Sequence, residues 1–285
     1  RTARGTAIVN LLQLEGGEKV TAMLPVPEER VSGHYLIMAT KNGLIKRTEL
    51  SEFTNLRRTG LIAIVLREDD DLIAVALTDG SRDGFLGTEQ GIAIRFAESD
   101  MRPIGRAAMG VKSIELDDGD SVVAMSILED GAQVLSLTQL GYGKRTEIEE
   151  YRVQSRAGKG IKAMNLTDKT GLLAGQLLVH EDEDLLLITD DGTVIRTPVS
   201  AISVQGRNTQ GVRIMRVDEG VKVVCVARAE PEDDEDDEIE VVGTTASCTP
   251  NSCPNALDVS PEDLNADLTG DTETPESAPD NDDEV

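Results

Sequence analysis

The chain has no tryptophan, and aromatic residues make up only 2% of its 285 residues. A hydrophobic content of 39% is still ordinary for a globular protein, so we expect a core of Val, Ile, Leu, Ala and Met. Proteins that bind single-stranded nucleic acid stack the bases on aromatic rings. The shortage of rings therefore argues against single-strand binding and against readout by base stacking.

Cysteine and histidine are also scarce. The odd set of Cys225, Cys248 and Cys253 suggests a reducing cytoplasm. Cys248 and Cys253 have no second pair or histidine nearby, so we expect no zinc site and no other metal site. His34 and His180 lack matching partners in the sequence, so we interpret both as structural or solvated and name no catalytic residue.

No apolar run approaches the length of a membrane span, which predicts a soluble, cytoplasmic chain with no membrane partner. There is no signal peptide, and Arg1 is an unusual first residue, so we expect a fragment of a longer protein. The net charge of −25 is unevenly placed. Residues 230–285 contain 20 Asp and Glu and no Lys or Arg, whereas residues 1–229 hold 33 acids against 28 bases, a net of −5.

A repeat of about 50 residues organises residues 1–229. Four segments share a threonine, a glycine three positions later and an arginine four positions after the glycine: "TKNGLIKRTEL", "TEQGIAIRFAE", "TQLGYGKRTEI" and "TDDGTVIRTPV". Their glycines are 48, 50 and 51 residues apart. Asn-Gly and Asp-Gly in the first and last copies predict a hairpin with a two-residue turn.

A second element follows each hairpin. "RAAMGV", "RAGKGI" and "RNTQGV" place an arginine four residues before a glycine, and "RTARGT" at the start of the chain fits the same pattern. The copy at "LRRTGL" is degenerate, with Arg57 and Arg58 one and two positions late. An acidic or glycine-containing turn and an aliphatic run come next in every repeat.

These features predict an all-β, propeller-like array. We expect half of one repeat in residues 1–28 and four whole repeats up to residue 229. Residues 230–285 are rich in acidic residues, Pro, Ser and Thr, and we expect this acidic tail to be disordered because it buries too little apolar surface.

The repeated cations are the candidate binding residues. Guanidinium and ammonium groups beside small residues and free backbone N–H groups suit phosphate. We therefore predict duplex DNA contacts at two rows of cations. The loop row is Arg57, Arg58, Arg106, Arg156, Lys159 and Arg207, and the hairpin row is Lys46, Arg47, Arg95, Lys144, Arg145 and Arg196. A repeated arginine can instead be a structural staple that bonds carbonyl or carboxylate groups of a neighbouring blade, and that alternative stays open.

The chain resembles a known family, the C-terminal domains of the A subunit of bacterial DNA gyrase. The strings "IVNLLQLEGGEKVTAMLPV", "GYGKRTEIEEY", "SRAGKGI", "TDDGTVIRT" and "GRNTQGV" carry the resemblance over residues 1 to about 229. It implies a β-pinwheel, a disc of six blades that wraps duplex DNA around its rim. The parent enzyme would be an ATP-dependent type II topoisomerase that introduces negative supercoils.

The resemblance also implies partners that this chain does not contain. They are the B subunit of gyrase and a second A subunit, with ATP and Mg²⁺ held by other domains, so no cofactor is expected here. The family's box reads Gln, basic, Arg, Gly, Gly, basic, Gly. The loop Gln154, Ser155, Arg156, Ala157, Gly158, Lys159 and Gly160 is similar, but Ser155 and Ala157 depart from the box. We interpret it as a diverged copy and expect the box itself to precede Arg1.

Other interpretations remain, of the tail and of the function. The acidic tail could compete with DNA for the cationic rim, since a flexible tether raises its local concentration to roughly millimolar, or it could only aid solubility. The domain could be that of topoisomerase IV, although the tail and "GRNTQGV" favour gyrase. A propeller used only for docking proteins, with no DNA contact, is the rival from another class, and an enzymatic function is third because no catalytic constellation is found.

Overall fold

A computed structural model describes residues 20–27, 30–55 and 60–231 of the chain. The chain divides into two compact units, Arg1–Asp233 and Asp234–Val285, and every described residue lies in the first. Among the described residues the regular helical elements are short 3₁₀ turns, and none could cross a membrane. The predicted acidic tail beyond residue 231 lies outside the described residues.

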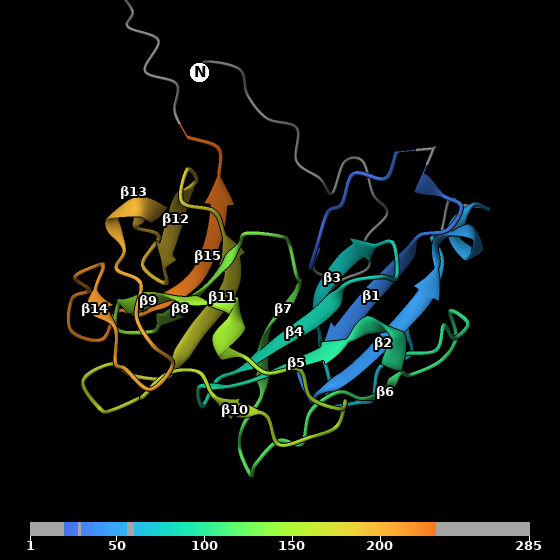
Figure 1. The fold of residues 1–285 in the computed structure, drawn as a ribbon, viewed down its shortest axis with the longest axis horizontal. Helices are drawn as coiled ribbons and strands as arrows, with labels where there is room; N and C mark the ends of the chain where they lie inside the picture. The colour runs from blue at the N-terminus through green and yellow to red at the C-terminus, as the bar shows by residue number, and fades with distance from the viewer. Residues whose placement is uncertain (1–19, 28–29, 56–59, 232–285) are drawn as a thin grey trace, which may run out of the picture. The chain divides into compact units, whose positions relative to one another are not determined.

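Each repeat begins with an antiparallel hairpin, as the sequence predicts (Figure 1). The four hairpins are β1 (Tyr35–Thr40) with β2 (Leu44–Glu49), β4 (Asp83–Thr88) with β5 (Ile92–Ala97), β8 (Gln133–Thr138) with β9 (Tyr142–Glu147), and β12 (Asp184–Thr189) with β13 (Val194–Pro198). A 3₁₀ turn closes each one, at Leu50–Phe53, Glu98–Asp100, Ile148–Glu150 and Val199–Ala201.

The prediction of two-residue turns at the hairpin tips is wrong. A type I′ turn needs a positive φ at both central residues. Here Asn42 and Asp191 do not adopt a positive φ, whereas Gly43 and Gly192 do, at +78° and +89°. Gly43 donates its N–H to Thr40 and Gly192 to Thr189, which gives a three-residue loop that ends in a left-handed glycine.

A third strand of each repeat pairs with the first strand of its own hairpin. These strands are β3 (Leu72–Thr78), β7 (Val122–Ile127), β11 (Leu173–Val179) and β15 (Val223–Ala229). β7 packs between β3 and β11, and β11 packs between β7 and β15. They follow one another through the middle of Figure 1, so the third strands hold successive blades together.

The fourth strand of a blade comes from the following repeat. Three two-residue strands, each just after an Arg-x-x-x-Gly element, pair with the hairpin one repeat earlier. They are β6 (Val111–Lys112) on β2, β10 (Ile161–Lys162) on β5, and β14 (Val212–Arg213) on β9. The fourth sheet has the order β13-β12-β15 among the described residues and lacks such a strand.

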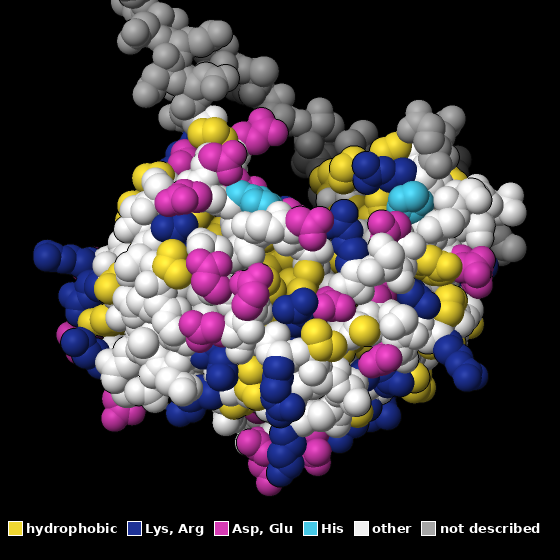
Figure 2. All heavy atoms as spheres, in the orientation of Figure 1, with side chains coloured by type: hydrophobic (Ala, Val, Ile, Leu, Met, Phe, Trp, Pro, Cys, Tyr) yellow, Lys and Arg dark blue, Asp and Glu magenta, His cyan; other side chains and the backbone are white. Residues whose placement is uncertain are grey.

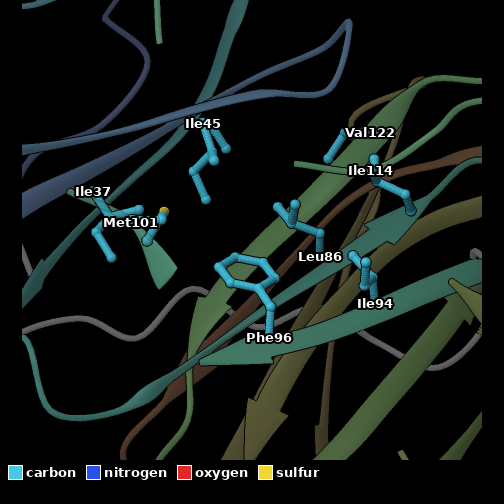
Figure 3. Packing of buried hydrophobic residues seen from close by; sticks show 9 residues of the cluster. Ile37, Ile45, Leu86, Ile94, Phe96, Met101, Ile114 and Val122 are labelled. Atoms are coloured by element: carbon cyan, nitrogen blue, oxygen red, sulfur yellow. The ribbon is translucent and has the colours of Figure 1, made fainter. Parts of the chain in front are cut away.

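The hydrophobic core lies between blades as well as inside them. One cluster joins Ile37 and Ile45 of the first hairpin to Leu86, Ile94 and Phe96 of the second (Figure 3). All five side chains are buried because alternate strand residues point to the packed face. A second cluster joins the third and fourth repeats in the same way and includes Leu135, Leu187 and Val199. The described blades therefore form a propeller-like array of small antiparallel sheets, which confirms the predicted all-β, propeller-like fold; the six blades that the resemblance implies stay a prediction.

Candidate functional site

Two lysines of the predicted hairpin row lie inside the protein. Lys46 and Lys144 are both 0% exposed. The Nζ of Lys144 donates to the backbone oxygens of Gly206 and Arg207, at 2.6 Å each. The Nζ of Lys46 donates to Ala63 O at 2.6 Å, to Ala108 O at 3.2 Å and to Arg106 O. Each lysine thus fastens the Arg-x-x-x-Gly loop of the following repeat.

Burial explains how these lysines titrate. Desolvation lowers the pKa of Lys144 to about 8, opposed by the charge of Glu150 and assisted by that of Arg207. Desolvation also lowers the pKa of Lys46, whereas Glu52 acts in the opposite direction. Bonds to carbonyl oxygens compensate the buried ammonium groups in part. Neither amine is placed to contact a phosphate.

The arginine that follows each lysine position reaches the 3₁₀ turn of the next repeat. Arg145 is 4% exposed and donates through Nε to Ile202 O at 2.7 Å. Arg95, which is half-buried, bonds Ile148 O, Tyr151 O and the carboxylate of Asp83. Arg47 is 8% exposed, approaches Glu98 at 3.5 Å and lies over the ring of Tyr35.

The alternative of a structural staple is therefore the role that the structure gives to Lys46, Arg47, Arg95, Lys144 and Arg145. Guanidinium and ammonium groups that already serve buried acceptors cannot turn outward without leaving those acceptors unpaired. We remove these five residues from the candidate interface. Arg196, in the last repeat, is exposed, but it donates to Asp184 and to Glu230 O.

The glycine of each Arg-x-x-x-Gly element has a steric task. Gly110, Gly160 and Gly211 adopt φ values of +100°, +73° and +74°. A Cβ at these positions would lie 2.7, 2.7 and 2.5 Å from the backbone oxygens of Ile45, Ala93 and Gly143, respectively. Only glycine permits both this conformation and so close an approach of the loop to the preceding hairpin.

Two backbone N–H groups of the box-like loop at residues 154–160 donate to carbonyl oxygens of other segments of the protein. Gln154 donates to Arg95 O at 2.8 Å and Ala157 to Ser113 O at 2.7 Å. These two groups are therefore not free to cradle phosphate, contrary to the expectation from the sequence. Ala157 has a φ of +66°, where the family box carries a glycine. The loop thus keeps the backbone shape of a glycine-containing turn.

The loop arginines clamp the two-residue strands. Nη1 of Arg156 donates to Lys112 O at 2.6 Å, and Nη1 of Arg207 donates to Lys162 O at 2.8 Å. Both side chains are half-buried, as is that of Arg106. Lys159 is exposed. Arg57 and Arg58 lie outside the described residues.

A row of exposed cations escaped the sequence analysis. Lys112, Lys162 and Arg213 close the strands β6, β10 and β14, 50 and 51 residues apart. The signal was available, because each is the second residue after the glycine of an Arg-x-x-x-Gly element. Figure 2 displays one face of the molecule and shows dark blue Lys and Arg side chains along its edge, near the positions of β10 and β14 in Figure 1. We call Lys112, Lys162 and Arg213 the strand-cation row.

A polar cavity of about 620 Å³ is lined by residues of the first three repeats. Both histidines line it; His34 lies 3.2 Å from Ser32 O, and His180 lies 3.2 Å from Glu129. Burial alone would raise the pKa of Glu129, but hydrogen bonds and charge from Arg228 and His180 lower it. Among the described residues no group of three or more His, Cys, Asp or Glu is arranged to hold a metal ion.

Comparison with known families gives one match that covers most of the chain. The family described as the DNA gyrase C-terminal domain, a beta-propeller, matches residues 1–27, 34–79, 85–129, 132–175 and 183–229. The A subunit of DNA gyrase from Halalkalibacterium halodurans is 59% identical over 242 residues, which cover 85% of this chain and 29% of the relative. That of Salmonella typhimurium is 40% identical over 237 residues, 83% of this chain and 27% of the relative. The chain thus spans less than a third of these relatives.

Two solved structures share the fold. The C-terminal domain of DNA topoisomerase IV aligns with a TM-score of 0.75 at 27% identity, covering 80% of this chain and 72% of that one. A DNA gyrase A C-terminal domain aligns with a TM-score of 0.71 at 23% identity, covering 79% and 75%. At 23% identity the second likeness shows the fold alone.

Proposed function

Because the chain belongs to the DNA gyrase C-terminal domain family, we propose that it binds duplex DNA and wraps it around the rim of its blades. In the parent enzyme, this wrapping would support ATP-dependent negative supercoiling by the complex of two A subunits with the B subunits. ATP and Mg²⁺ would act on other domains of that complex, in the cytoplasm. The family and the exposed cations at matching places in successive repeats support the proposal.

The physics of wrapping requires contacts that repeat. Smoothly bending a site of 20 to 30 base pairs by 40 to 90° costs on the order of 1–6 kcal/mol. A single ion pair on a protein surface contributes about 0–1 kcal/mol. Cations at one position of each blade follow the duplex and share the bending cost, which makes the repeat spacing itself functional.

The test is the salt dependence of duplex affinity, because each phosphate neutralised contributes about −0.9 to the slope of log K against log salt. We expect a steep slope for residues 1–285. Affinity that hardly changes with salt, or no duplex binding, would refute the proposal and favour a protein-docking propeller. A supercoiling assay of a complete A subunit that carries this domain, together with the B subunit of gyrase, separates gyrase from topoisomerase IV, whose C-terminal domain shares the fold.

The acidic tail enters as a second part of the proposal. Residues 230–285 carry 20 acidic residues without a balancing Lys or Arg, and a tethered polyanion would compete with phosphate for cations. Replacing the Asp and Glu residues of 232–285 by Asn and Gln keeps the length and removes 19 of these 20 negative charges. Tighter duplex binding at fixed salt is expected. Unchanged or weaker binding would leave the tail as a solubilising segment.

A further inference from the structure

Each member of the strand-cation row sits on a backbone that a neighbouring repeat holds in place. β6, β10 and β14 are only two residues long, so few ladder bonds fix them. Their glycines pack against the preceding hairpin, at the backbone oxygens of Ile45, Ala93 and Gly143. The residue after each glycine and the cation pair with that hairpin in the same register: Lys112 lies opposite Leu44, Lys162 opposite Ile92, and Arg213 opposite Tyr142.

The loop arginines supply the second restraint. Arg156 bonds the carbonyl oxygen of Lys112, and Arg207 bonds that of Lys162, so each loop arginine fixes the cation of the preceding loop. Further polar contacts of Arg207 are ion pairing with Glu150 at 3.9 Å and a position over the ring of Tyr151. A half-buried guanidinium with these partners is placed to hold protein backbone.

The third cation is held by its side chain. Arg213 donates from Nε and Nη2 to the hydroxyl of Tyr142, at 3.2 and 2.8 Å, and its guanidinium lies 5.2 Å from the ring centroid. Lys169 lies 5.6 Å from the centroid of the same ring. Two cations therefore converge on one tyrosine. Because both side chains already contact the same ring, less side-chain entropy is lost when an anion binds to them.

We propose that Lys112, Lys162 and Arg213 are the residues that contact DNA phosphates, and that Arg156, Arg207 and Tyr142 are positioning residues that hold them. This inference rests on the proposed function and assigns its phosphate contacts to the second residue after each loop glycine. It also divides the predicted loop row: Arg156 and Arg207 act through the strands, and the strand cations meet the phosphate. Lys162 is free to do so because its contact to Asn165, at 3.5 Å, is weak and exposed.

The central experiment compares two double variants of the full chain on one linear duplex, as affinity against salt. Lys112→Gln/Lys162→Gln removes two row members, whereas Arg30→Gln/Arg82→Gln removes two cations that line the polar cavity. The row variant should lower the magnitude of the slope by about 1.8, so that the affinity lost between about 50 and 200 mM salt shrinks about tenfold. The control variant should keep the wild-type slope.

Positioning and contact separate in the single variants. Arg213→Gln should reduce the slope by about 0.9, whereas Tyr142→Phe keeps both cations and should weaken binding with the slope unchanged. Arg156→Ala should behave like Tyr142→Phe. Urea midpoints within the range of the wild type show that the exposed substitutions leave the fold intact.

The outcomes distinguish duplex binding by the domain from phosphate contact by the strand-cation row. A steep wild-type slope that the row variant leaves unchanged overturns the row but keeps duplex binding. An equal fall in the control variant also overturns it, because any surface charge would then count. A fall of about 0.9 for Arg156→Ala makes that arginine a contact and overturns the division of roles. A flat wild-type slope overturns the proposed function and the row together.

Discussion

In what we call strand exchange, the following repeat supplies the fourth strand of a blade, as β10 does for β5. Gly160→Ala tests whether this pairing depends on the close approach of the loop to the hairpin. The φ of Gly160 is +73°, and a Cβ there would lie 2.7 Å from both Ala93 O and Ile92 Cγ2. Gly119 has nearly the same φ, +76°, but nothing within 4 Å of its Cβ position. Gly119→Ala is thus a matched control that carries the conformational cost alone.

The magnitudes follow from these two environments. An L-residue in the left-handed region costs about 1–2 kcal/mol, and the loss of glycine from the unfolded chain returns about 0.4–1 kcal/mol in both variants. Only Gly160→Ala adds an overlap with backbone, which is an overpacking cost of about 1–3 kcal/mol. We therefore expect Gly160→Ala to lower the free energy of unfolding by about 1–3 kcal/mol more than Gly119→Ala.

Urea unfolding followed by far-UV circular dichroism measures this difference, provided that the m-values of the two variants agree. In thermal scans the extra loss corresponds to about 2–4 °C per kcal/mol for a domain of this size. Equal losses in the two variants would refute the reasoning, because the contact between Gly160 and the hairpin would then contribute nothing to stability.

The remaining predictions concern other parts of the same framework. Arg145→Ala should lower the free energy of unfolding by about 1–3 kcal/mol through the orphaned Ile202 carbonyl, without changing the salt slope of duplex binding; a reduced slope would restore Arg145 to the interface. Ala157→Gly should raise the urea midpoint, since the left-handed φ of +66° costs alanine about 1–2 kcal/mol; a lower midpoint would contradict this. Lys144 has a folded pKa of about 8, below its unfolded value of 10.5, so the unfolded chain binds more protons between these values. The free energy of unfolding of the wild type relative to Lys144→Met should therefore rise from pH 8 to pH 10.5, and a difference that falls over this range would show the opposite shift.

The repeat and its hairpins were predictable because they rest on local signals. Glycine at a fixed offset, alternating apolar residues and a constant period each act within one repeat. Gly110 and Gly160, the glycines of two Arg-x-x-x-Gly loops, mark the contacts of loop with hairpin. The sequence alone did not indicate which atoms they approach.

The exchange of β6, β10 and β14 could not be predicted, since a two-residue strand has too short a pattern to display a period. The roles of adjacent cations were equally hidden. Lys144 and Arg145 point to opposite faces of β9, so alternation predicts that one of the two is buried, yet both are. Their acceptors lie more than 50 residues away, at Arg207 and Ile202. Only the tertiary structure places those carbonyls within reach.

Strand exchange makes the repeat in the sequence and the blade in the structure different units. A cut between two repeats would separate β10 from β5, or β14 from β9, and would leave a hairpin with one bare edge. Coupling between neighbours then enters the stability of every blade, as in other repeat proteins. If a repeat were gained or lost during evolution, the repeats on either side would still have to pair with each other, because each blade combines strands of two successive repeats. If the domain wraps DNA as proposed, tension on one blade would pass directly to the next.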